Sequence, residues 1–255
     1  MVKIDCKGYA EDILDRVGKI PNKGNLMIVT AGHDPASEAY IRGKLKDAER
    51  CGIRAARCVV KNQDELEAAV RFDDLVNFSG IIIQLPLPKG FDEDWCVNFV
   101  DTEKDVDGFK SGSPFTPCTP EGIMWILRKE IGDLTGKTAL VIGRGKLVGE
   151  PIAKLLLKAN CTVTIAHSKT RGLEEMLKSF DIIICAAGVP KLVDLAKCKA
   201  EIVIDAGISK YEGKLCGDSY NLEDTGEGLK VACMPNGIGL ITRAVLMAHV
   251  ARMEV

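Results

Sequence analysis

Short apolar runs alternate along the chain with longer stretches in which apolar residues recur every three to four positions. The short runs predict strands at 26–30, 55–60, 80–84, 138–142, 162–166, 181–185 and 201–205. The longer stretches predict helices over 36–51, 63–76, 120–131, 149–159, 172–179 and about 241–253. Strands that alternate with helices in this way are typical of βαβ units with a mainly parallel sheet. The pattern therefore predicts an α/β fold.

The segment 101–118 interrupts this alternation with Asp, Gly, Ser and Pro residues. Because connections between domains often have such a composition, we expect two domains. The first is expected to cover residues 1–118 together with the C-terminal helix at 241–255, which returns to it. The second is expected to cover residues 119–240.

A glycine cluster follows the strand predicted at 138–142. Gly143, Gly145 and Gly149 give the spacing G-x-G-x-x-x-G, and a helical pattern begins directly after them. A strand, a glycine turn and a helix N-terminus form a pyrophosphate site, because backbone N–H groups can approach the phosphates where no Cβ intervenes. A βα turn that needs glycine only for packing is the alternative. The motif favours a Rossmann-type dinucleotide-binding domain.

The next predicted strand runs into His167 and Ser168, with Lys169 and Arg171 directly after them. An NAD site usually carries Asp or Glu near this point, where the carboxylate binds the ribose 2′-hydroxyl. Here the segment has no carboxylate, and Arg144 adds a cation in the glycine turn. Positive and hydroxyl-bearing side chains suit a 2′-phosphate, so the sequence favours NADP over NAD. The alternative is that the two cations after Ser168 are ordinary solvated residues of a loop.

Composition narrows the classes of function. The 34 Lys and Arg residues nearly balance the 36 Asp and Glu residues, and no long basic stripe supports nucleic-acid binding. The longest apolar runs have the length of strands, so no membrane span is expected, and the charged N-terminal residues are unlike a signal peptide. The ten cysteines are scattered singly. This is typical of reduced thiols in a cytoplasmic protein and offers no clustered metal ligands.

The first domain has candidate polar residues on one helix and in two loops. Tyr40 and Lys44 share one face of the helix predicted over 36–51. On the residues alone, we expect Lys44 to be a surface lysine whose stem covers apolar side chains. Gln84 ends a strand of three isoleucines, where it either contacts a ligand or caps the strand. Asp107, in the loop that leaves this domain, either binds a ligand or closes an Asx-type turn.

Six motifs in fixed order resemble the methylenetetrahydrofolate dehydrogenase/methenyltetrahydrofolate cyclohydrolase family. They lie at residues 34–46, 84–88, 104–109, 117–122, 141–149 and 162–168. The resemblance implies a bifunctional enzyme that oxidises 5,10-methylenetetrahydrofolate with NADP and hydrolyses the methenyl product to 10-formyltetrahydrofolate. It implies an N-terminal parallel-sheet α/β catalytic domain that binds folate, a Rossmann-type NADP-binding domain and a cleft between them. Tetrahydrofolate derivatives are the expected partners, and the expected assembly is a homodimer.

The resemblance also implies roles for individual residues. Lys44 is similar to the lysine central to the cyclohydrolase step, Gln84 to its hydrogen-bonding partner, and Asp107 to the carboxylate that holds the pterin. Tyr40 is similar to the ring that stacks on the aminobenzoate of folate. The expected substrate-binding residues are Tyr40, Pro86 and Gly237, and the expected cofactor-binding residues are Gly143, Arg144, Gly145, His167, Ser168 and Ile208.

Four segments depart from the family pattern. Gly145 stands where the family usually has serine, the loop 109–117 is shorter, and residues 217–220 read Gly-Asp-Ser-Tyr. Residues 235–242 read Pro-Asn-Gly-Ile-Gly-Leu-Ile-Thr, where the family has a second glycine and a later proline. Asn tolerates positive φ, so we expect that turn to survive. These departures leave open a member that keeps one activity or prefers NAD, and a catalytically silent folate- or nucleotide-binding paralogue.

Overall fold

The computed structural model describes residues 1–32, 35–71 and 77–255. The first residue of the motif at 34–46 and the end of the helix predicted over 63–76 lie outside these ranges. The chain divides into two compact units. Unit 1 consists of residues 1–9 and 119–242, and unit 2 consists of residues 10–118 and 243–255.

The first nine residues lie in a different unit from the one that the sequence indicated. They were expected in the first domain, but β1 (Val2–Lys3) pairs in parallel with β13 (Lys230–Ala232) of unit 1. Ile4 continues this pairing, because its N–H donates to the carbonyl of Val231 at 2.9 Å. This strand pairs with a segment more than 200 residues away in the chain, so no local pattern predicts it. Unit 1 also extends to residue 242 rather than 240.

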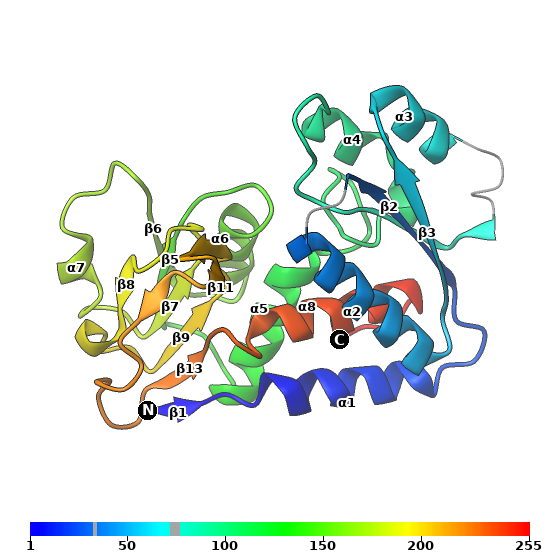
Figure 1. Ribbon diagram of the computed structural model, residues 1–255. Coiled ribbons are helices and arrows are strands. Elements are labelled where there is room, and N and C mark those ends of the chain that lie inside the picture. The colour runs from blue at the N-terminus through cyan, green and yellow to red at the C-terminus, as the bar shows by residue number, and fades with distance from the viewer. Residues whose placement is uncertain (33–34, 72–76) are drawn as a thin grey trace. The chain divides into compact units, whose positions relative to one another are not determined.

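Unit 1 contains a six-stranded parallel sheet in the order β1-β13-β9-β7-β5-β6 (Figure 1). Its strands include β5 (Thr138–Ile142), β6 (Thr162–Ala166), β7 (Ile182–Cys185) and β9 (Ile202–Asp205). All four residues of β7 and of β9 are buried, as expected for central strands of a parallel sheet that is covered on both faces. The four strands predicted in this region are therefore confirmed.

The helices of unit 1 follow the predicted pattern, with one exception. α6 (Gly149–Lys158) packs on β5 and β6 (Figure 1), and α5 (Cys118–Glu130) and α8 (Ile238–Val250) lie close to the predicted positions. α7 (Leu173–Met176) is a single turn and is shorter than the helix predicted over 172–179. Two small strand pairs complete the unit: β8 (Val193–Asp194) with β12 (Ser219–Tyr220), and β10 (Ser209–Tyr211) with β11 (Lys214–Cys216).

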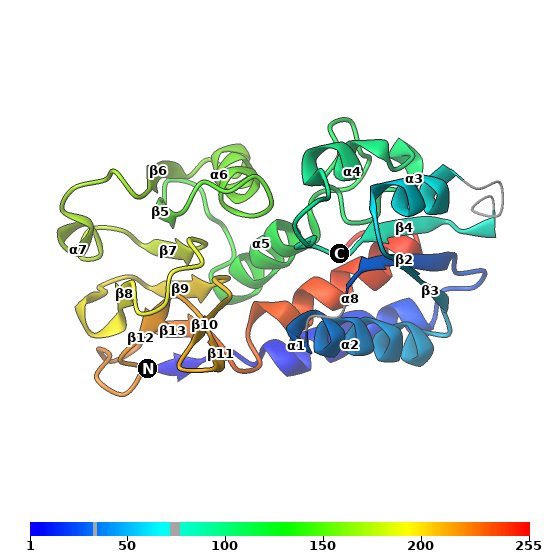
Figure 2. The ribbon, with the colours of Figure 1, turned by 45° about the horizontal axis from the view of Figure 1, so that its top comes forward.

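Unit 2 is built on a three-stranded parallel sheet with β2 at its centre. The strands are β2 (Asn25–Ala31), β3 (Arg54–Val60) and β4 (Gly80–Ile83), and the helices are α1 (Cys6–Gly18), α2 (Pro35–Cys51), α3 (Gln63–Arg71) and α4 (Glu93–Phe99). α3 and α4 lie on one side of the sheet, while α2, most of α1 and residues 243–250 of α8 lie on the other (Figures 1 and 2). Leu66 of α3 and Cys96 of α4 share a buried cluster with Val29 and Ile81 of the sheet.

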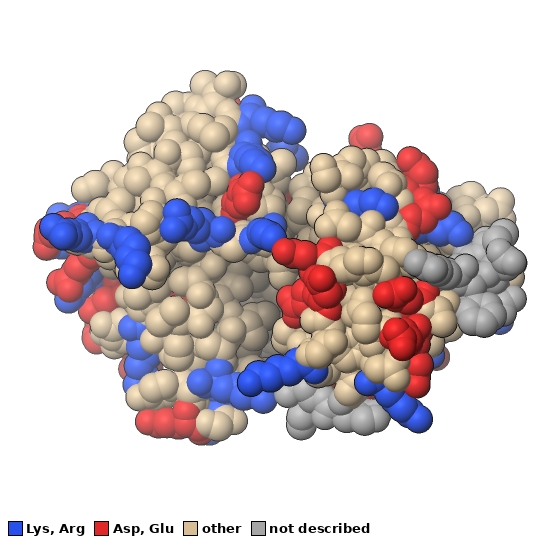
Figure 3. All heavy atoms as spheres, turned by 90° about the horizontal axis from the view of Figure 1, so that it is seen from above, with Lys and Arg blue, Asp and Glu red and all other residues tan. Residues whose placement is uncertain are grey.

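Charges of both signs occur on the surface. In the face shown in Figure 3, basic and acidic side chains are both visible, with uncharged surface between them. Of the helices in the described part of the chain, none is long and apolar enough to cross a membrane.

Candidate functional sites

Tyr40 and Lys44 lie on α2, but Lys44 is not the surface lysine that the residues alone suggested. It is 4 % exposed, and its Nζ atom lies 5.1 Å from the centre of the Tyr40 ring. The structure gives this ammonium group no hydrogen bond or ion pair with a described residue. The ammonium group of Lys44 is therefore available for a ligand.

Gln84 follows β4 and is only partly satisfied by its own loop. Its N–H donates to the carbonyl of Val29 at 2.8 Å and so continues the β2–β4 ladder. Its Nε2 donates to the carbonyl of Leu85 at 2.8 Å, but its Oε1 is buried and accepts no hydrogen bond from a described residue. An unsatisfied buried acceptor costs about 1–3 kcal/mol. Capping of the loop therefore accounts for Nε2 of Gln84, and Oε1 can accept a hydrogen bond from a ligand.

The two aspartates of the 104–109 motif have different roles. Asp105 closes the turn: its Oδ1 accepts from the N–H of Gly108 at 3.2 Å and its Oδ2 from the N–H of Lys110 at 2.8 Å. Burial, and next the charge of Asp107, raise the pKa of Asp105, although the two backbone donors oppose this. Asp107 is also buried, yet no described residue donates to its carboxylate. The Asx-type turn thus belongs to Asp105, and Asp107 remains available for a ligand.

Pro86 and Gly237 lie in turns of different units. Pro86 is exposed and follows a cis peptide bond in unit 2, whereas Gly237 precedes α8 in unit 1. Asn236 has a φ of 64°, as the substitution in this loop led us to expect. A Cβ on Gly237 would lie 2.8 Å from the backbone carbon of Cys233. Glycine is therefore required there for close packing of the chain.

Two of the three glycines in the dinucleotide motif are required by packing. Gly143 has a φ of 113°, and a Cβ on it would overlap the carbonyl oxygen of Ala186. A Cβ on Gly149 would overlap the carbonyl of Gly143, whereas Gly145 has no neighbouring atom within 4 Å of a Cβ position. No side chain caps the N-terminus of α6. The two glycines thus agree with the packing alternative, and the uncapped N-terminus of α6 is the feature that fits a phosphate group.

The segment after β6 lies beside this glycine turn. The N–H of Gly143 donates to the carbonyl of Ala166 at 2.8 Å, directly before His167. His167 closes a short turn with Thr170, whose Oγ1 accepts from the His167 N–H at 2.9 Å. The Nδ1 of His167 accepts from the N–H of Lys169 at 3.1 Å, so a neutral ring carries its proton on Nε2.

The polar groups needed for a 2′-phosphate are accessible. Arg144, Ser168, Lys169 and Arg171 are all exposed. They lie in the glycine turn and in the segment after β6, which the Gly143–Ala166 hydrogen bond joins. This arrangement fits the expected preference for NADP.

Ile208 belongs to the same edge of the sheet in unit 1. It is 63 % exposed, and its carbonyl oxygen lies 3.7 Å from a Cβ position on Gly188. Gly143 and Ile208 therefore both adjoin the loop after β7, which contains residues 186–189. Open α/β sheets bind ligands at the carboxyl ends of their strands, and this loop leaves the carboxyl end of β7.

Two buried aspartates that we did not predict hold this loop in place. The carboxylate of Asp218 accepts from the N–H groups of residues 187, 188 and 189 at 2.7, 3.2 and 2.8 Å. Asp205 in turn accepts from the N–H of Asp218 at 3.1 Å and of Ser219 at 2.8 Å. Burial raises the pKa of Asp218, and its backbone donors lower it. A polar residue at the end of a buried strand could have indicated Asp205, but no comparable signal marks Asp218.

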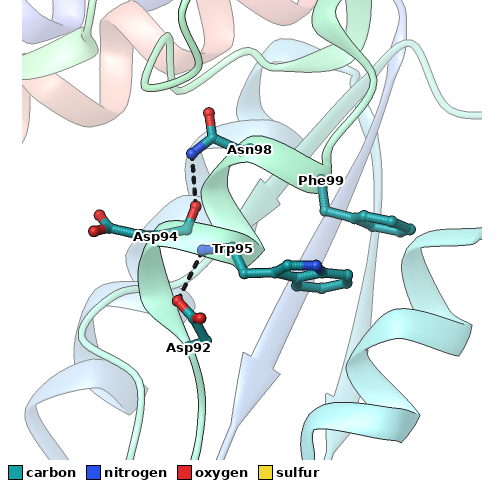
Figure 4. Close-up of a pocket in the computed structure, with 5 residues that line it drawn as sticks. All are labelled: Asp92, Asp94, Trp95, Asn98 and Phe99. Carbon is teal, nitrogen blue, oxygen red and sulfur yellow. Dashed lines mark hydrogen bonds between the residues drawn. The ribbon is translucent and has the colours of Figure 1, made fainter.

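A surface pocket on α4 is separate from all of these residues. Its lining consists of Asp92, Asp94, Trp95, Asn98 and Phe99 (Figure 4). The rings of Trp95 and Phe99 stack with centres 4.2 Å apart, and Asp92 caps the helix by accepting from the N–H of Trp95 at 2.9 Å. These contacts stabilise α4, and no predicted site residue lines the pocket.

Comparison with protein families covers most of the chain. The catalytic domain of the tetrahydrofolate dehydrogenase/cyclohydrolase family matches residues 4–107. The NAD(P)-binding domain of the same family matches residues 117–254.

Individual relatives match over nearly their whole length. The bifunctional protein FolD of Agathobacter rectalis is 36% identical over 264 residues, which cover 98% of this chain and 95% of that protein. The structure of the bifunctional FolD methylenetetrahydrofolate dehydrogenase/cyclohydrolase from Campylobacter jejuni is 32% identical, with a TM-score of 0.89 and coverage of 99% and 98%. The Trypanosoma brucei enzyme, complexed with NADP and an inhibitor, is 28% identical, with a TM-score of 0.89 and coverage of 98% and 95%.

Proposed function

The chain belongs to the tetrahydrofolate dehydrogenase/cyclohydrolase family, and we propose that the residues described above carry out its two reactions. It is a bifunctional enzyme of one-carbon metabolism. It oxidises 5,10-methylenetetrahydrofolate to 5,10-methenyltetrahydrofolate with NADP, and it hydrolyses that product to 10-formyltetrahydrofolate.

Unit 1 provides the residues for the dehydrogenase cofactor. NADP, when bound, supplies the acceptor for the hydride that leaves the methylene carbon. Gly143 and Gly149 let the backbone approach the pyrophosphate, and the uncapped N-terminus of α6 favours its charge. Arg144 and Ser168 are assigned to the 2′-phosphate, while His167 and Ile208 line the same edge. Gly145 is assigned to the cofactor through its backbone, and a Cβ there would meet no protein atom within 4 Å.

Unit 2 provides the residues for the cyclohydrolase step. A water molecule adds to the methenyl carbon and loses a proton, and the carbon–nitrogen bond that then breaks must gain one. We assign this proton transfer to Lys44, whose neutral amino group takes the proton from water and returns it to the leaving nitrogen. Gln84 accepts a hydrogen bond from this amino group through Oε1. The observation that carries the assignment is the presence, in one unit, of a buried lysine with no acceptor among the described residues and a buried amide oxygen with no donor among them.

The remaining residues of unit 2 are assigned to folate binding. The Asp107 carboxylate accepts hydrogen bonds from the pterin, because Asp105 rather than Asp107 is used by the turn. The ring of Tyr40 stacks on the aminobenzoate, and Pro86 shapes the loop after Gln84. Gly237, in unit 1, is assigned to the substrate as well.

The variant Lys44→Met tests the assignment. Loss of a proton-transfer group lowers a rate by about 10²–10⁴-fold, so cyclohydrolase activity should fall by that amount while hydride transfer continues. Lys46→Met is the matched control, because Lys46 is an exposed lysine on the same helix, and it should leave both rates unchanged. Full cyclohydrolase activity in Lys44→Met would rule the assignment out.

We also propose that the protein is a cytoplasmic homodimer and that its 10-formyltetrahydrofolate supplies purine biosynthesis. Free thiols at all ten cysteines support a reducing compartment. Tyr211 and Leu215, on the β10–β11 pair, are large exposed apolar side chains that suit a contact between copies. Light scattering should give twice the chain mass of 27.6 kDa, and a monomer mass at micromolar concentration would contradict the dimer.

A further inference from the structure

One face of α2 carries more than the two residues expected from the sequence. Lys44 and Asp47 are three positions apart on this helix, so their side chains are neighbours on its surface, where a lysine and an aspartate commonly form an ion pair. In this chain the carboxylate of Asp47 is bound elsewhere. Arg243, from α8, donates from Nε to Oδ2 of Asp47 at 2.8 Å.

Gly43 makes room for this arginine. A Cβ on Gly43 would overlap Nη1 of Arg243 and lie 2.7 Å from its Cζ. The guanidinium group therefore lies against the backbone of α2, one residue before Lys44. The side chains of Arg243 and Asp47 are 20% and 11% exposed, so the pair is largely removed from water. Tyr40 completes this face, because its ring contacts the ammonium group of Lys44.

Among the cations that act on Asp47, Arg243 has the largest effect. Burial raises the pKa of Asp47, and the attraction and hydrogen bond of Arg243 are the largest opposing effects, followed by Arg50 and Lys46. A buried carboxylate that loses its partner becomes an uncompensated charge, and it attracts the cations around it. Arg50 and Lys46 are exposed to solvent, whereas Lys44, three positions before Asp47 on α2, is buried beside it.

We propose that Arg243 is a positioning residue for Lys44: by binding Asp47, it prevents that carboxylate from capturing the lysine. An ion pair with Asp47 would occupy the ammonium group of Lys44 and turn the side chain along the helix. Proton transfer requires a neutral amino group that points at the substrate. The inference rests on the proposed function of Lys44, and it adds Arg243, Asp47 and Gly43 as a set that keeps this group available.

The test compares Arg243→Met with the double variant Arg243→Met/Asp47→Asn. The single variant should lower the cyclohydrolase kcat about tenfold or more, since proton transfer is lost in the captured state. Dehydrogenase kcat should stay within about twofold, because hydride transfer needs no proton shuttle. The double variant should recover most of the cyclohydrolase rate, because no carboxylate remains to capture Lys44. Arg42→Met is the matched control, because Arg42 is an exposed arginine on α2.

Several results would overturn the inference. A double variant as slow as the single one, or an equal fall of both activities in Arg243→Met, would mean that Arg243 only attaches α8 to α2. If thermal unfolding shows that Arg243→Met does not fold, Asp47→Asn alone decides: it should keep its cyclohydrolase activity, and a selective loss would refute the inference. Lys44→Met separates the two proposals. If it is fully active, the proposed function fails, whereas if it is inactive and the double variant is not rescued, only the role of Arg243 fails.

Discussion

Gly143 offers a sharp test of the dinucleotide site, through the variant Gly143→Ala. The backbone φ of 113° at this position lies where L-residues are rare. The added Cβ would also overlap the carbonyl oxygen of Ala186, in the loop that follows β7. Rotation of a side chain cannot relieve either problem, because both involve backbone atoms. The turn must therefore move away from its position at the end of β5.

The size of the effect follows from these two terms. A residue held in a sparsely populated backbone region costs about 1–3 kcal/mol, and overpacking of a well-packed contact costs about 1–3 kcal/mol more. If about 3 kcal/mol of this is lost from the NADP complex, binding weakens about a hundredfold, since each 1.4 kcal/mol is tenfold. The cyclohydrolase residues lie in unit 2, so that activity should change little.

Isothermal titration with NADP and the KM for NADP are the measurements, with the thermal midpoint as the check on folding. Gly145→Ala is the matched control, because its Cβ has no neighbour within 4 Å and its φ is not positive. It should bind NADP within about twofold of the original protein. Unchanged NADP affinity in Gly143→Ala, or an equal loss in both variants, would refute the reasoning.

Three further predictions concern other parts of unit 1. Gly145→Ser has room for the added hydroxyl. One hydrogen bond from it to a charged phosphate, worth about 1.5 kcal/mol, should lower the KM for NADP about tenfold. An unchanged KM would mean that the turn does not face the phosphate. Asp218→Ala removes the acceptor of three backbone N–H groups, so the free energy of unfolding in urea should fall by about 3 kcal/mol or more. The KM for NADP should rise as well, and unchanged values of both would contradict the role of Asp218. The hydrogen bond to Glu130 raises the pKa of Tyr9 to about 12, above its ordinary value, so the stability it contributes is present at lower pH and is lost as the pH rises towards 12. Tyr9→Phe should flatten the pH dependence of urea unfolding in that alkaline window, and an identical dependence in both proteins would exclude this origin.

The strands of the fold were predictable because their physical cause is local. The isoleucine-rich runs at 182–185 and 202–205 are central strands, buried on both faces. α1 was not predicted, although Ile13, Leu14 and Val17 have the spacing of a buried helical face. β1 carries no such signal, since its partner is β13, at the far end of the chain.

The candidate sites were predictable only as far as residue type and strand ends allow. Gln84 became a candidate because it ends a buried strand. The burial of Lys44 was not found, because it depends on packing that helical periodicity does not record. Asp105 and Asp107 are two positions apart, and only the backbone of the turn decides which one accepts its N–H groups. The ion pair of Arg243 with α2 joins residues 196 positions apart, which no local pattern indicates.

The most direct measurement is a paired assay on the purified protein. Methylenetetrahydrofolate is offered with NADP or NAD while nicotinamide reduction is followed, and methenyltetrahydrofolate decay is followed separately against hydrolysis in buffer. Both activities, with NADP preferred, are the predicted result. Absence of both activities in folded protein would contradict the account and would indicate a folate- or nucleotide-binding protein without catalytic activity.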